Sequence, residues 1–278
     1  MKTIGEVIAL SARYLEERKI ASPRLQVEQI LAHVLGIKRI ELYMQFDRPL
    51  LEVELEKMRS LLKRRAAGEP LGYLFGEVDF YHCKFEITRD VLIPRPETEI
   101  LLDKVVKKIN GQKTAWDVCC GPGILGIALK KQFPAMEVVL SDISPQALEV
   151  AKKNGAKNGV EVTFLQGDLL EPFRGKKADL VLCNPPYISE AEYPQLCPEV
   201  RNFEPKGALV GGSTGLEFYD RLARSLPQFL NPGALVFFEI GTGQGDAVAR
   251  FFTAPCWKNP LLEKDWSGHD RFFFLEFE

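Results

Sequence analysis

The sequence lacks several features that mark particular classes of protein. No apolar run approaches the ~20 residues that a membrane-spanning helix needs, and the N-terminus lacks the apolar core of a signal peptide. The six cysteines form no Cys-x-x-Cys pair and no Cys/His ligand spacing, and the three histidines are scattered. We therefore expect a cytoplasmic protein with free thiols, no membrane association and no metal site.

An excess of either charge sign is also absent. The 36 Lys and Arg residues and 38 Asp and Glu residues leave a net charge of −2 on 278 residues. Proteins that bind nucleic acid through its phosphates carry a basic surface, so this balance argues against direct nucleic-acid binding. The composition is that of an ordinary globular protein with one large core or two modest ones, and we expect a monomer.

The first ~70 residues have the 3.6-residue apolar period that is typical of helices. The expected helix signals are a capping box at Thr3 and Glu6, an N-cap at Ser22 before Pro23, a stop at Gly36, and a third helix over 52–67. These helices carry no obvious chemistry. Residues 1–74 are therefore expected to form a small helical bundle that recognises a partner.

Residues 75–98 are expected to link this bundle to a second domain. The segments 77–80 and 84–88 alternate between apolar and polar residues, which predicts two short strands in a hairpin. Pro94 and Pro96 stiffen the segment that follows, so we expect no helix before Glu97 or Thr98.

Residues 99–278 alternate strand and helix patterns, which indicates an α/β domain with a mostly parallel sheet. Strands are expected near 115–119, 136–141, 161–165, 178–183, 234–240, 258–264 and 271–277, and helices near 124–132, 145–157, 215–229 and 244–253. No clear helix separates the last two strands. We therefore expect an antiparallel pair at the edge of the sheet.

A glycine-containing loop, D-V-C-C-G-P-G at 117–123, joins the first of these strands to a helix. Glycines let the backbone approach a ligand closely. Gly121, Gly123 and Gly126 also match the G-x-G-x-x-G spacing of dinucleotide-binding folds, so an oxidoreductase is a rival at this point. Asp142 ends the second strand, where it is placed to accept hydrogen bonds from ribose hydroxyls.

The tetrapeptide Asn184-Pro185-Pro186-Tyr187 follows the apolar strand at 178–183. Each proline restricts the residue before it, and neither has an N–H, so the turn offers acceptors with few competing donors. Tyr187 adds a flat face. Such a site suits a planar amino group, whose two protons need two acceptors. We expect Asn184 Oδ1 and the Pro185 carbonyl to accept them, Pro186 to hold the turn, and Tyr187 to pack against the amide plane.

Together these residues resemble the class I S-adenosylmethionine-dependent methyltransferases. The segment L-I-P-R-P-E-T-E at 92–99 and the helical N-terminus make the chain similar, nearly end to end, to HemK/PrmC-type release-factor glutamine methyltransferases. The segments 69–73, 239–241 and 265–271 support the resemblance. It implies a Rossmann-like α/β fold with a seven-stranded, mostly parallel sheet, and S-adenosyl-L-methionine as cofactor. It also implies methylation of glutamine N5 in the Gly-Gly-Gln motif of class I peptide-chain release factors.

The resemblance implies a set of site residues as well. Substrate binding falls on the tetrapeptide 184–187, and catalysis on its members Asn184, Pro185 and Tyr187. Cofactor binding falls on Cys119, Cys120, Gly121, Pro122, Gly123, Asp142, Asp168, Leu169 and Asn184. One departure stands out, because the family loop usually reads D-x-G-x-G-x-G and Cys119 stands at its first glycine. Cysteine does not freely adopt positive φ, so we expect either an extended Cys119 or a shifted loop that binds the cofactor less tightly.

Two further hypotheses about function remain open from the sequence alone. The planar amino group could be an exocyclic amine of adenine or guanine in a nucleic acid. The chain could also be a non-catalytic binding module with a lapsed methyltransferase fold, a reading that Cys119 would suit.

Overall fold

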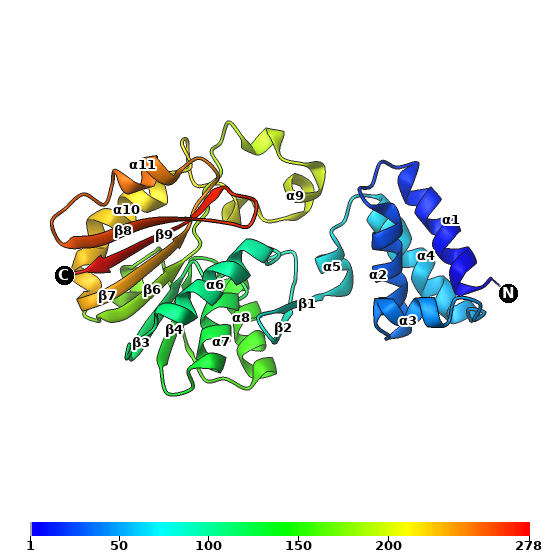
Figure 1. Cartoon of the computed structure of the whole chain (residues 1–278), viewed down its shortest axis with the longest axis horizontal. Helices are drawn as coiled ribbons and strands as arrows, with labels where there is room; N and C mark the ends of the chain where they lie inside the picture. The colour runs from blue at the N-terminus through cyan, green and yellow to red at the C-terminus, as the bar shows by residue number, and fades with distance from the viewer. Residues whose placement is uncertain (1) are drawn as a thin grey trace. The chain divides into compact units, whose positions relative to one another are not determined.

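The computed structural model describes residues 2–278, which divide into two compact units, each with a hydrophobic core (Figure 1). The helical unit extends to Gly76 and includes the separate segment Pro198–Phe203. The sheet unit comprises Glu77–Cys197 and Glu204–Glu278. Among the described residues, no helix combines the length and the apolar composition that a membrane span requires.

The helical unit contains α1 (Ile4–Glu16), α2 (Pro23–Leu35), α3 (Arg39–Met44), α4 (Glu52–Ala66) and α5 (Leu71–Phe75). The capping box is confirmed, since Thr3 Oγ1 accepts from the Glu6 N–H and Glu6 Oε2 accepts from the Thr3 N–H. Gly36 ends α2 with φ +65°, as expected. Ser22 is the N-cap residue of α2 and precedes Pro23, as expected, but its side chain makes no capping hydrogen bond. This residue has φ +48°, whereas a capping side chain needs an extended backbone.

A short helix from late in the chain, α9 (Pro198–Phe203), belongs to the helical unit, although we expected residues 99–278 to lie in the other domain. Arg65 on α4 is buried, and its Nη2 donates to Glu199 Oε2 at 2.5 Å while its Nη1 donates to the Glu69 carbonyl at 2.9 Å. A buried guanidinium is costly without such partners, so Glu199 ties α9 to this unit.

The sheet unit begins with an antiparallel hairpin of β1 (Glu77–Phe80) and β2 (Cys83–Glu86). Its main sheet has seven strands in the order β5-β4-β3-β6-β7-β9-β8. Their bounds are β3 (Thr114–Val118), β4 (Glu137–Asp142), β5 (Thr163–Gln166), β6 (Ala178–Cys183), β7 (Leu230–Glu239), β8 (Trp257–Lys264) and β9 (Asp270–Phe277). Only β9 runs against the others, so the expected mostly parallel sheet with an antiparallel edge pair is confirmed.

Helices cover both faces of this sheet. The helices α6 (Pro96–Lys108), α7 (Ile124–Gln132) and α8 (Pro145–Asn158) lie together on one face (Figure 1), and α10 (Glu217–Ser225) and α11 (Gly245–Ala249) pack on the other. Three expected bounds are wrong. The helix α6 begins at Pro96, because proline suits the first helical turn. The helix expected over 215–229 ends at Ser225 and is followed by a 3₁₀ turn at Leu226–Phe229, where Pro227 lacks an N–H. The helix α11, expected to reach residue 253, stops at Ala249.

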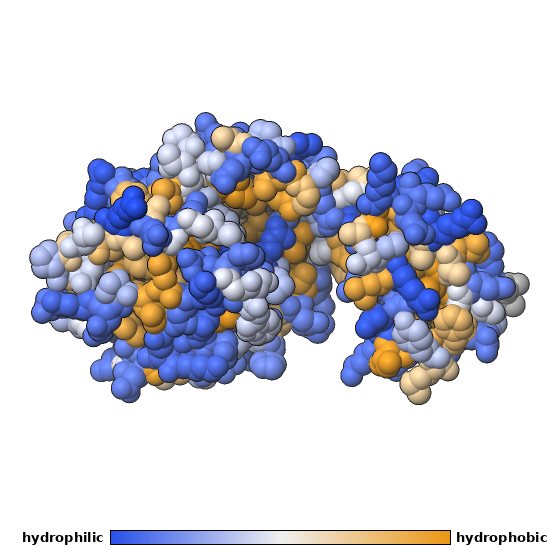
Figure 2. Space-filling model, turned by 45° about the horizontal axis from the view of Figure 1, so that its top comes forward, coloured by the Kyte–Doolittle hydropathy of each residue, from blue (hydrophilic) through white to orange (hydrophobic). Residues whose placement is uncertain are grey.

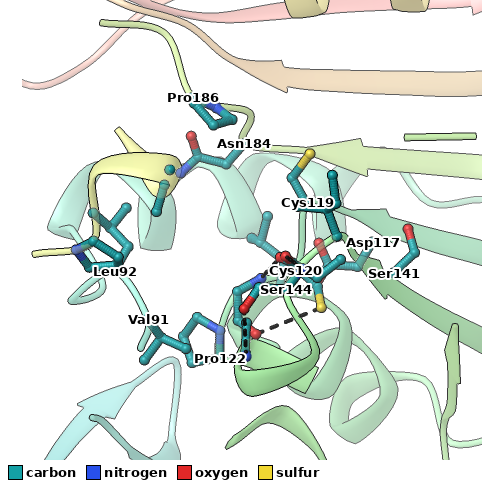
Figure 3. A pocket seen from close by; sticks show the side chains of 18 of the residues that line it. Val91, Leu92, Asp117, Cys119, Cys120, Pro122, Ser141, Ser144, Asn184 and Pro186 are labelled. Atoms are coloured by element: carbon teal, nitrogen blue, oxygen red, sulfur yellow. Dashed lines mark hydrogen bonds between the residues drawn. The ribbon is translucent and has the colours of Figure 1, made fainter. Parts of the chain in front are cut away.

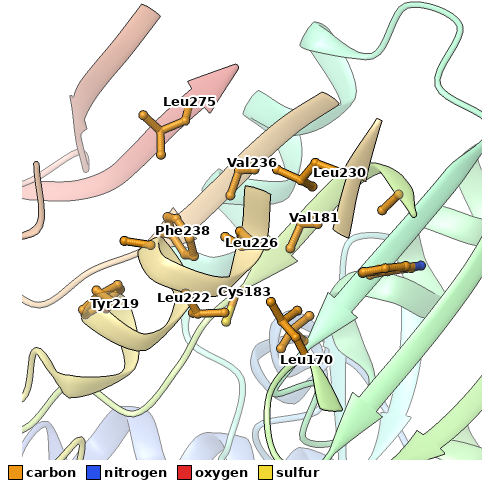
Figure 4. Packing of buried hydrophobic residues seen from close by; sticks show 14 of the residues in the cluster. Leu170, Val181, Cys183, Tyr219, Leu222, Leu226, Leu230, Val236, Phe238 and Leu275 are labelled. Atoms are coloured by element: carbon orange, nitrogen blue, oxygen red, sulfur yellow. The ribbon is translucent and has the colours of Figure 1, made fainter. Parts of the chain in front are cut away.

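The α10 face holds a hydrophobic core of the sheet unit (Figure 4). Alternate residues of the central strands, such as Val181 and Phe238, point to this face, as the two-residue period of a strand requires. Trp116 stacks on Phe173 with 4.0 Å between ring centroids, and both are almost fully buried. This packing fixes the strands in register, with Val118 paired to both Ser141 and Cys183. The carboxyl ends of β3, β4 and β6 therefore meet at one edge.

Candidate functional site

A cavity of about 370 Å³ opens at this edge, within the sheet unit (Figure 3). Its volume suits a small-molecule ligand, and the carboxyl edge of a parallel sheet is the usual place for one. Of the twelve site residues expected from the sequence, nine line the cavity: Cys119, Cys120, Gly121, Pro122, Asp142, Asp168, Leu169, Asn184 and Pro186. Gly123, Pro185 and Tyr187 do not.

The loop after β3 is strained at its first residue. Cys119 has φ +60°, so the expectation of an extended Cys119 is wrong, while a shifted loop stays a prediction. The neighbouring backbone explains this conformation: the Cys120 N–H donates to the Ser141 carbonyl at 2.9 Å, and the Gly123 N–H donates to the Cys120 carbonyl at 2.8 Å. These bonds hold Cys119 in the left-handed conformation that glycine adopts readily. A non-glycine residue there costs roughly 1–2 kcal/mol.

The third glycine of the loop packs a helix against a strand. A Cβ on Gly126 would lie 2.8 Å from Leu140 Cδ1 and 3.1 Å from the Cβ of Asp117. The Gly126 N–H donates to Asp117 Oδ2 at 2.8 Å, and this carboxyl is 1% exposed. Burial raises the pKa of Asp117 to about 7. Gly126, the third glycine of the G-x-G-x-x-G spacing, is therefore required by packing in this structure.

Ser141 (Figure 3) and Asp142, at the end of β4, bring polar atoms to the cavity. The Asp142 carboxyl accepts from the Gly121 N–H at 2.8 Å and from the Ser144 N–H at 2.9 Å, and its burial raises its pKa. A carboxylate has about four acceptor positions, so two remain for a ligand. Ser141 Oγ is the one buried side-chain polar atom of residues 2–278 without a hydrogen-bond partner. Such an atom marks a place for a ligand group.

On another wall, Asp168 forms an ion pair with Arg221, 2.6 Å between Oδ2 and Nη2. Arg221 was not expected in the site, because it lies on α10, far along the chain from Asp168. Leu169 beside Asp168 is 6% exposed and has φ +51°. Its side chain belongs to the sheet core, so it presents an apolar surface at the cavity.

A hydrogen-bond chain runs from the cavity into the protein behind Asn184. The Nδ2 of Asn184 donates to Thr98 Oγ1 at 3.4 Å, and the Thr98 hydroxyl donates to Glu239 Oε2 at 2.7 Å. Burial raises the pKa of Glu239 to about 7. Neither Thr98 nor Glu239 was assigned to the site from the sequence, although both lie in segments that carried the family resemblance, 92–99 and 239–241.

The rest of the tetrapeptide is clamped by glycine-rich loops. A Cβ on Gly211 would lie 2.2 Å from the Pro186 carbonyl oxygen, and a Cβ on Gly241 would lie 3.1 Å from Cδ2 of the Tyr187 ring. The Tyr187 carbonyl also accepts from Gln244 Nε2 at 2.9 Å. Burial raises the pKa of the Tyr187 hydroxyl to about 12. The turn is therefore rigid, and the Tyr187 ring packs beside Gly241 at a distance from the cavity lining.

Comparison with known proteins assigns both parts of the chain. Residues 6–76 match the PrmC N-terminal domain, and residues 96–198 match the methyltransferase small domain. A release factor glutamine methyltransferase of Geobacter sulfurreducens is 38% identical over 269 residues, covering 97% of this chain and 95% of the relative. The one of Chlamydia trachomatis serovar L2 is 41% identical, covering 96% of this chain and 91% of the relative.

Solved structures confirm the class I methyltransferase fold. A methyltransferase from Pyrococcus furiosus is similar with a TM-score of 0.53 at 16% identity, covering 80% of this chain and 98% of that one. A 16S rRNA N2 G1207 methyltransferase of Thermus thermophilus has a TM-score of 0.52 at 15% identity, covering 73% and 50%. At these identities the likeness concerns the fold alone.

The left-handed backbone of Cys119 generates a prediction about stability. Cys119→Gly and Cys119→Ala both remove the thiol and differ only in Cβ. At an ordinary position the alanine variant is more stable, whereas at φ +60° we expect the glycine variant to be more stable by ~1 kcal/mol. Urea unfolding followed by tryptophan fluorescence measures the difference. An alanine variant of equal or greater stability would contradict the assigned strain.

The raised pKa of Asp117 predicts how stability changes with pH. The carboxyl ionises near pH 4 in the unfolded chain but near pH 7 in the folded one, so folding loses stability as pH rises between these values. Asp117→Asn keeps an acceptor for Gly126 and cannot ionise. Its unfolding free energy relative to the wild type should therefore rise by ~2–3 kcal/mol from pH 5 to pH 8.

The matched control is Asp246→Asn, at an exposed position in the first turn of α11. Its stability should follow the wild type across the same pH range. A constant difference between Asp117→Asn and the wild type would show that the buried carboxyl does not titrate in this range.

Proposed function

Because the chain belongs to the release factor glutamine methyltransferase family, we propose that it methylates the side-chain amide nitrogen of the glutamine in the Gly-Gly-Gln motif of class I peptide-chain release factors, with S-adenosylmethionine as donor. The observation that carries this proposal is the Asn184 turn beside the cavity, with the amide NH₂ of Asn184 engaged behind it and its oxygen left to accept. Since release factors act in translation, we place the reaction in the cytoplasm.

The cavity residues fit S-adenosylmethionine. Asp142 retains acceptor positions for the two ribose hydroxyls, and the hydroxyl of Ser141 has no other partner among the described residues. Leu169 supplies an apolar surface for an adenine ring. Asp117 and Asp142 line the cavity, and in their ionised forms both complement a cationic sulfonium. When bound, this cofactor supplies an electrophilic methyl group.

The tetrapeptide supplies the acceptors for the glutamine amide. An amide nitrogen is a poor nucleophile because its lone pair is delocalised into the carbonyl. In our proposal Asn184 Oδ1 and the Pro185 carbonyl each accept one N–H of the substrate, and both bonds strengthen as the nitrogen gains positive charge. Pro186 keeps the turn rigid. The stacking role of Tyr187 stays a prediction, since its ring does not line the cavity.

The helical unit is proposed to recognise the release factor. Large apolar side chains are exposed on this unit, where Figure 2 shows hydrophobic patches at its surface: Leu10, Leu25, Ile40, Tyr43, Met44, Phe46, Leu51 and Val53. Exposed apolar patches of this kind mark protein interaction surfaces.

A prediction follows for substrate size. The wild type should methylate a whole release factor with a kcat/KM at least ~100-fold above that for a short Gly-Gly-Gln peptide, and Met44→Glu should remove much of this advantage. Initial rates with labelled S-adenosylmethionine measure both substrates. Equal efficiency with peptide and factor would contradict the recognition role of the helical unit.

The proposed function predicts different effects of two substitutions. Asn184→Ala should lower turnover of a purified release factor by ~100-fold or more, because it removes an acceptor that acts in the transition state. Its cofactor affinity should change much less. Asp142→Ala should weaken cofactor binding by ~10–100-fold through loss of charged hydrogen bonds. Transfer of the labelled methyl group, with mapping of the labelled residue, measures the first effect, and calorimetry measures the second.

Three outcomes would contradict the proposal. Near-normal methylation by Asn184→Ala would remove the role of the tetrapeptide. Label on a nucleic acid in place of the glutamine would favour the exocyclic-amine alternative. Absence of heat with S-adenosylmethionine at high concentration would favour a non-catalytic module.

A further inference from the structure

Resting on the proposed function, we infer that Thr98 and Glu239 are positioning residues that set which face of the Asn184 side-chain amide meets the substrate. The two residues come from different elements, Thr98 from the first turn of α6 and Glu239 from the end of β7, and both are 1% exposed. Asn184 follows β6. The hydrogen-bond chain therefore joins three elements behind the turn.

The direction of each hydrogen bond follows from the available protons. The ionised form of Glu239 has no proton to donate, so in that form the single Thr98 proton goes to Glu239 Oε2, 2.7 Å away. The Thr98 oxygen is then left with lone pairs only. Asn184 can approach it only through Nδ2, which lies 3.4 Å away. The amide oxygen of Asn184 is consequently turned away from Thr98 and is free to accept.

This orientation decides the chemistry of the site. A glutamine amide group brings two N–H donors, so it needs acceptors. With the Asn184 amide reversed, an NH₂ group would face another NH₂ group, and the substrate would lose one of its two acceptors. Asn184 cannot select the useful orientation by itself, since its oxygen and nitrogen have nearly the same size and shape. The selection comes from Thr98 and Glu239.

Neighbouring residues hold the hydrogen-bond chain of Asn184, Thr98 and Glu239 in place. The Tyr219 hydroxyl donates to the backbone carbonyl of Glu239 at 2.8 Å, which fixes the end of β7. Pro185 restricts the backbone of Asn184. Two arginines, Arg271 on β9 and Arg95 before α6, favour the charged form of the Glu239 carboxyl. Glu97 on α6 opposes it. The hydroxyls of Tyr187 and Tyr219 also lie near enough to interact with this carboxyl.

The central test compares Thr98→Val with Thr98→Ser. Valine keeps the shape of threonine without its hydroxyl, so kcat for a release factor should fall ~10–100-fold while the dissociation constant of S-adenosylmethionine stays within about twofold. Serine keeps the hydroxyl and should restore most of the rate. The matched control is Thr114→Val, which removes a threonine hydroxyl that accepts from the Asp179 N–H at the start of β3. It should leave kcat unchanged.

A second variant keeps the test independent of Thr98. Glu239→Gln places an NH₂ group where the carboxylate was. The Thr98 oxygen can then accept a hydrogen bond from residue 239, and the Thr98 hydroxyl proton can turn toward Asn184. We expect kcat to fall as it does in Thr98→Val. Because burial raises the pKa of Glu239 to about 7, wild-type kcat should rise as pH increases through 7, and this rise should be lost in Glu239→Gln. An unchanged pH profile would overturn the role of Glu239.

A direct readout separates this inference from the proposed function. In protein labelled with ¹⁵N-asparagine, the Asn184 side-chain NH₂ signals are identified by their loss in Asn184→Ala. They should shift, and exchange faster with water, in Thr98→Val but not in Thr98→Ser. Unchanged signals would overturn the inference even in an active enzyme. If the signals change in Thr98→Val but the wild type methylates no release factor, the orienting role of Thr98 and Glu239 would stand and the proposed function would be rejected.

Discussion

The site depends on one constraint, the parallel pairing of β3 with both β4 and β6. Val118 is in register with Ser141 on one side and with Cys183 on the other. Cys119 and Asn184, which follow strand ends, and Asp142, which ends β4, therefore lie at the same edge. A shift by one residue would turn every side chain to the opposite face. The buried stack of Trp116 on Phe173 opposes such a shift, so packing in the sheet core helps to hold the geometry of the cavity.

Much of this arrangement was predictable from the sequence, because it rests on local patterns. Alternation of apolar strands and helices predicted the sheet, and the strand ends placed Asp142 and Asn184 beside the cavity. The expected helix bounds failed at Pro96 and Pro227, because a proline can either open a helix in its first turn or interrupt it, and the local sequence does not show which. The short helices α3, α5 and α9 have too few turns to produce a clear period.

Other features could not be read from the sequence because they join distant segments. Arg221 reaches Asp168 from α10, and Thr98 on α6 reaches Glu239 at the end of β7. Cys119 shows a different limit. Its residue type argues against positive φ, but the hydrogen bonds of Cys120 and Gly123, which follow it in the loop, impose that backbone conformation. Local preference amounts to roughly 1–2 kcal/mol and is outweighed by the surrounding backbone.

The placement of α9 has a consequence for biosynthesis. Arg65 is buried against Glu199, which lies 134 residues later in the chain. During synthesis the N-terminal helices therefore leave the ribosome long before the carboxylate that neutralises this guanidinium exists. The helical unit reaches its final form only after most of the sheet unit has been translated. A nascent chain ending before α9 would thus carry an uncompensated charge in its interior, which favours late closure of this unit.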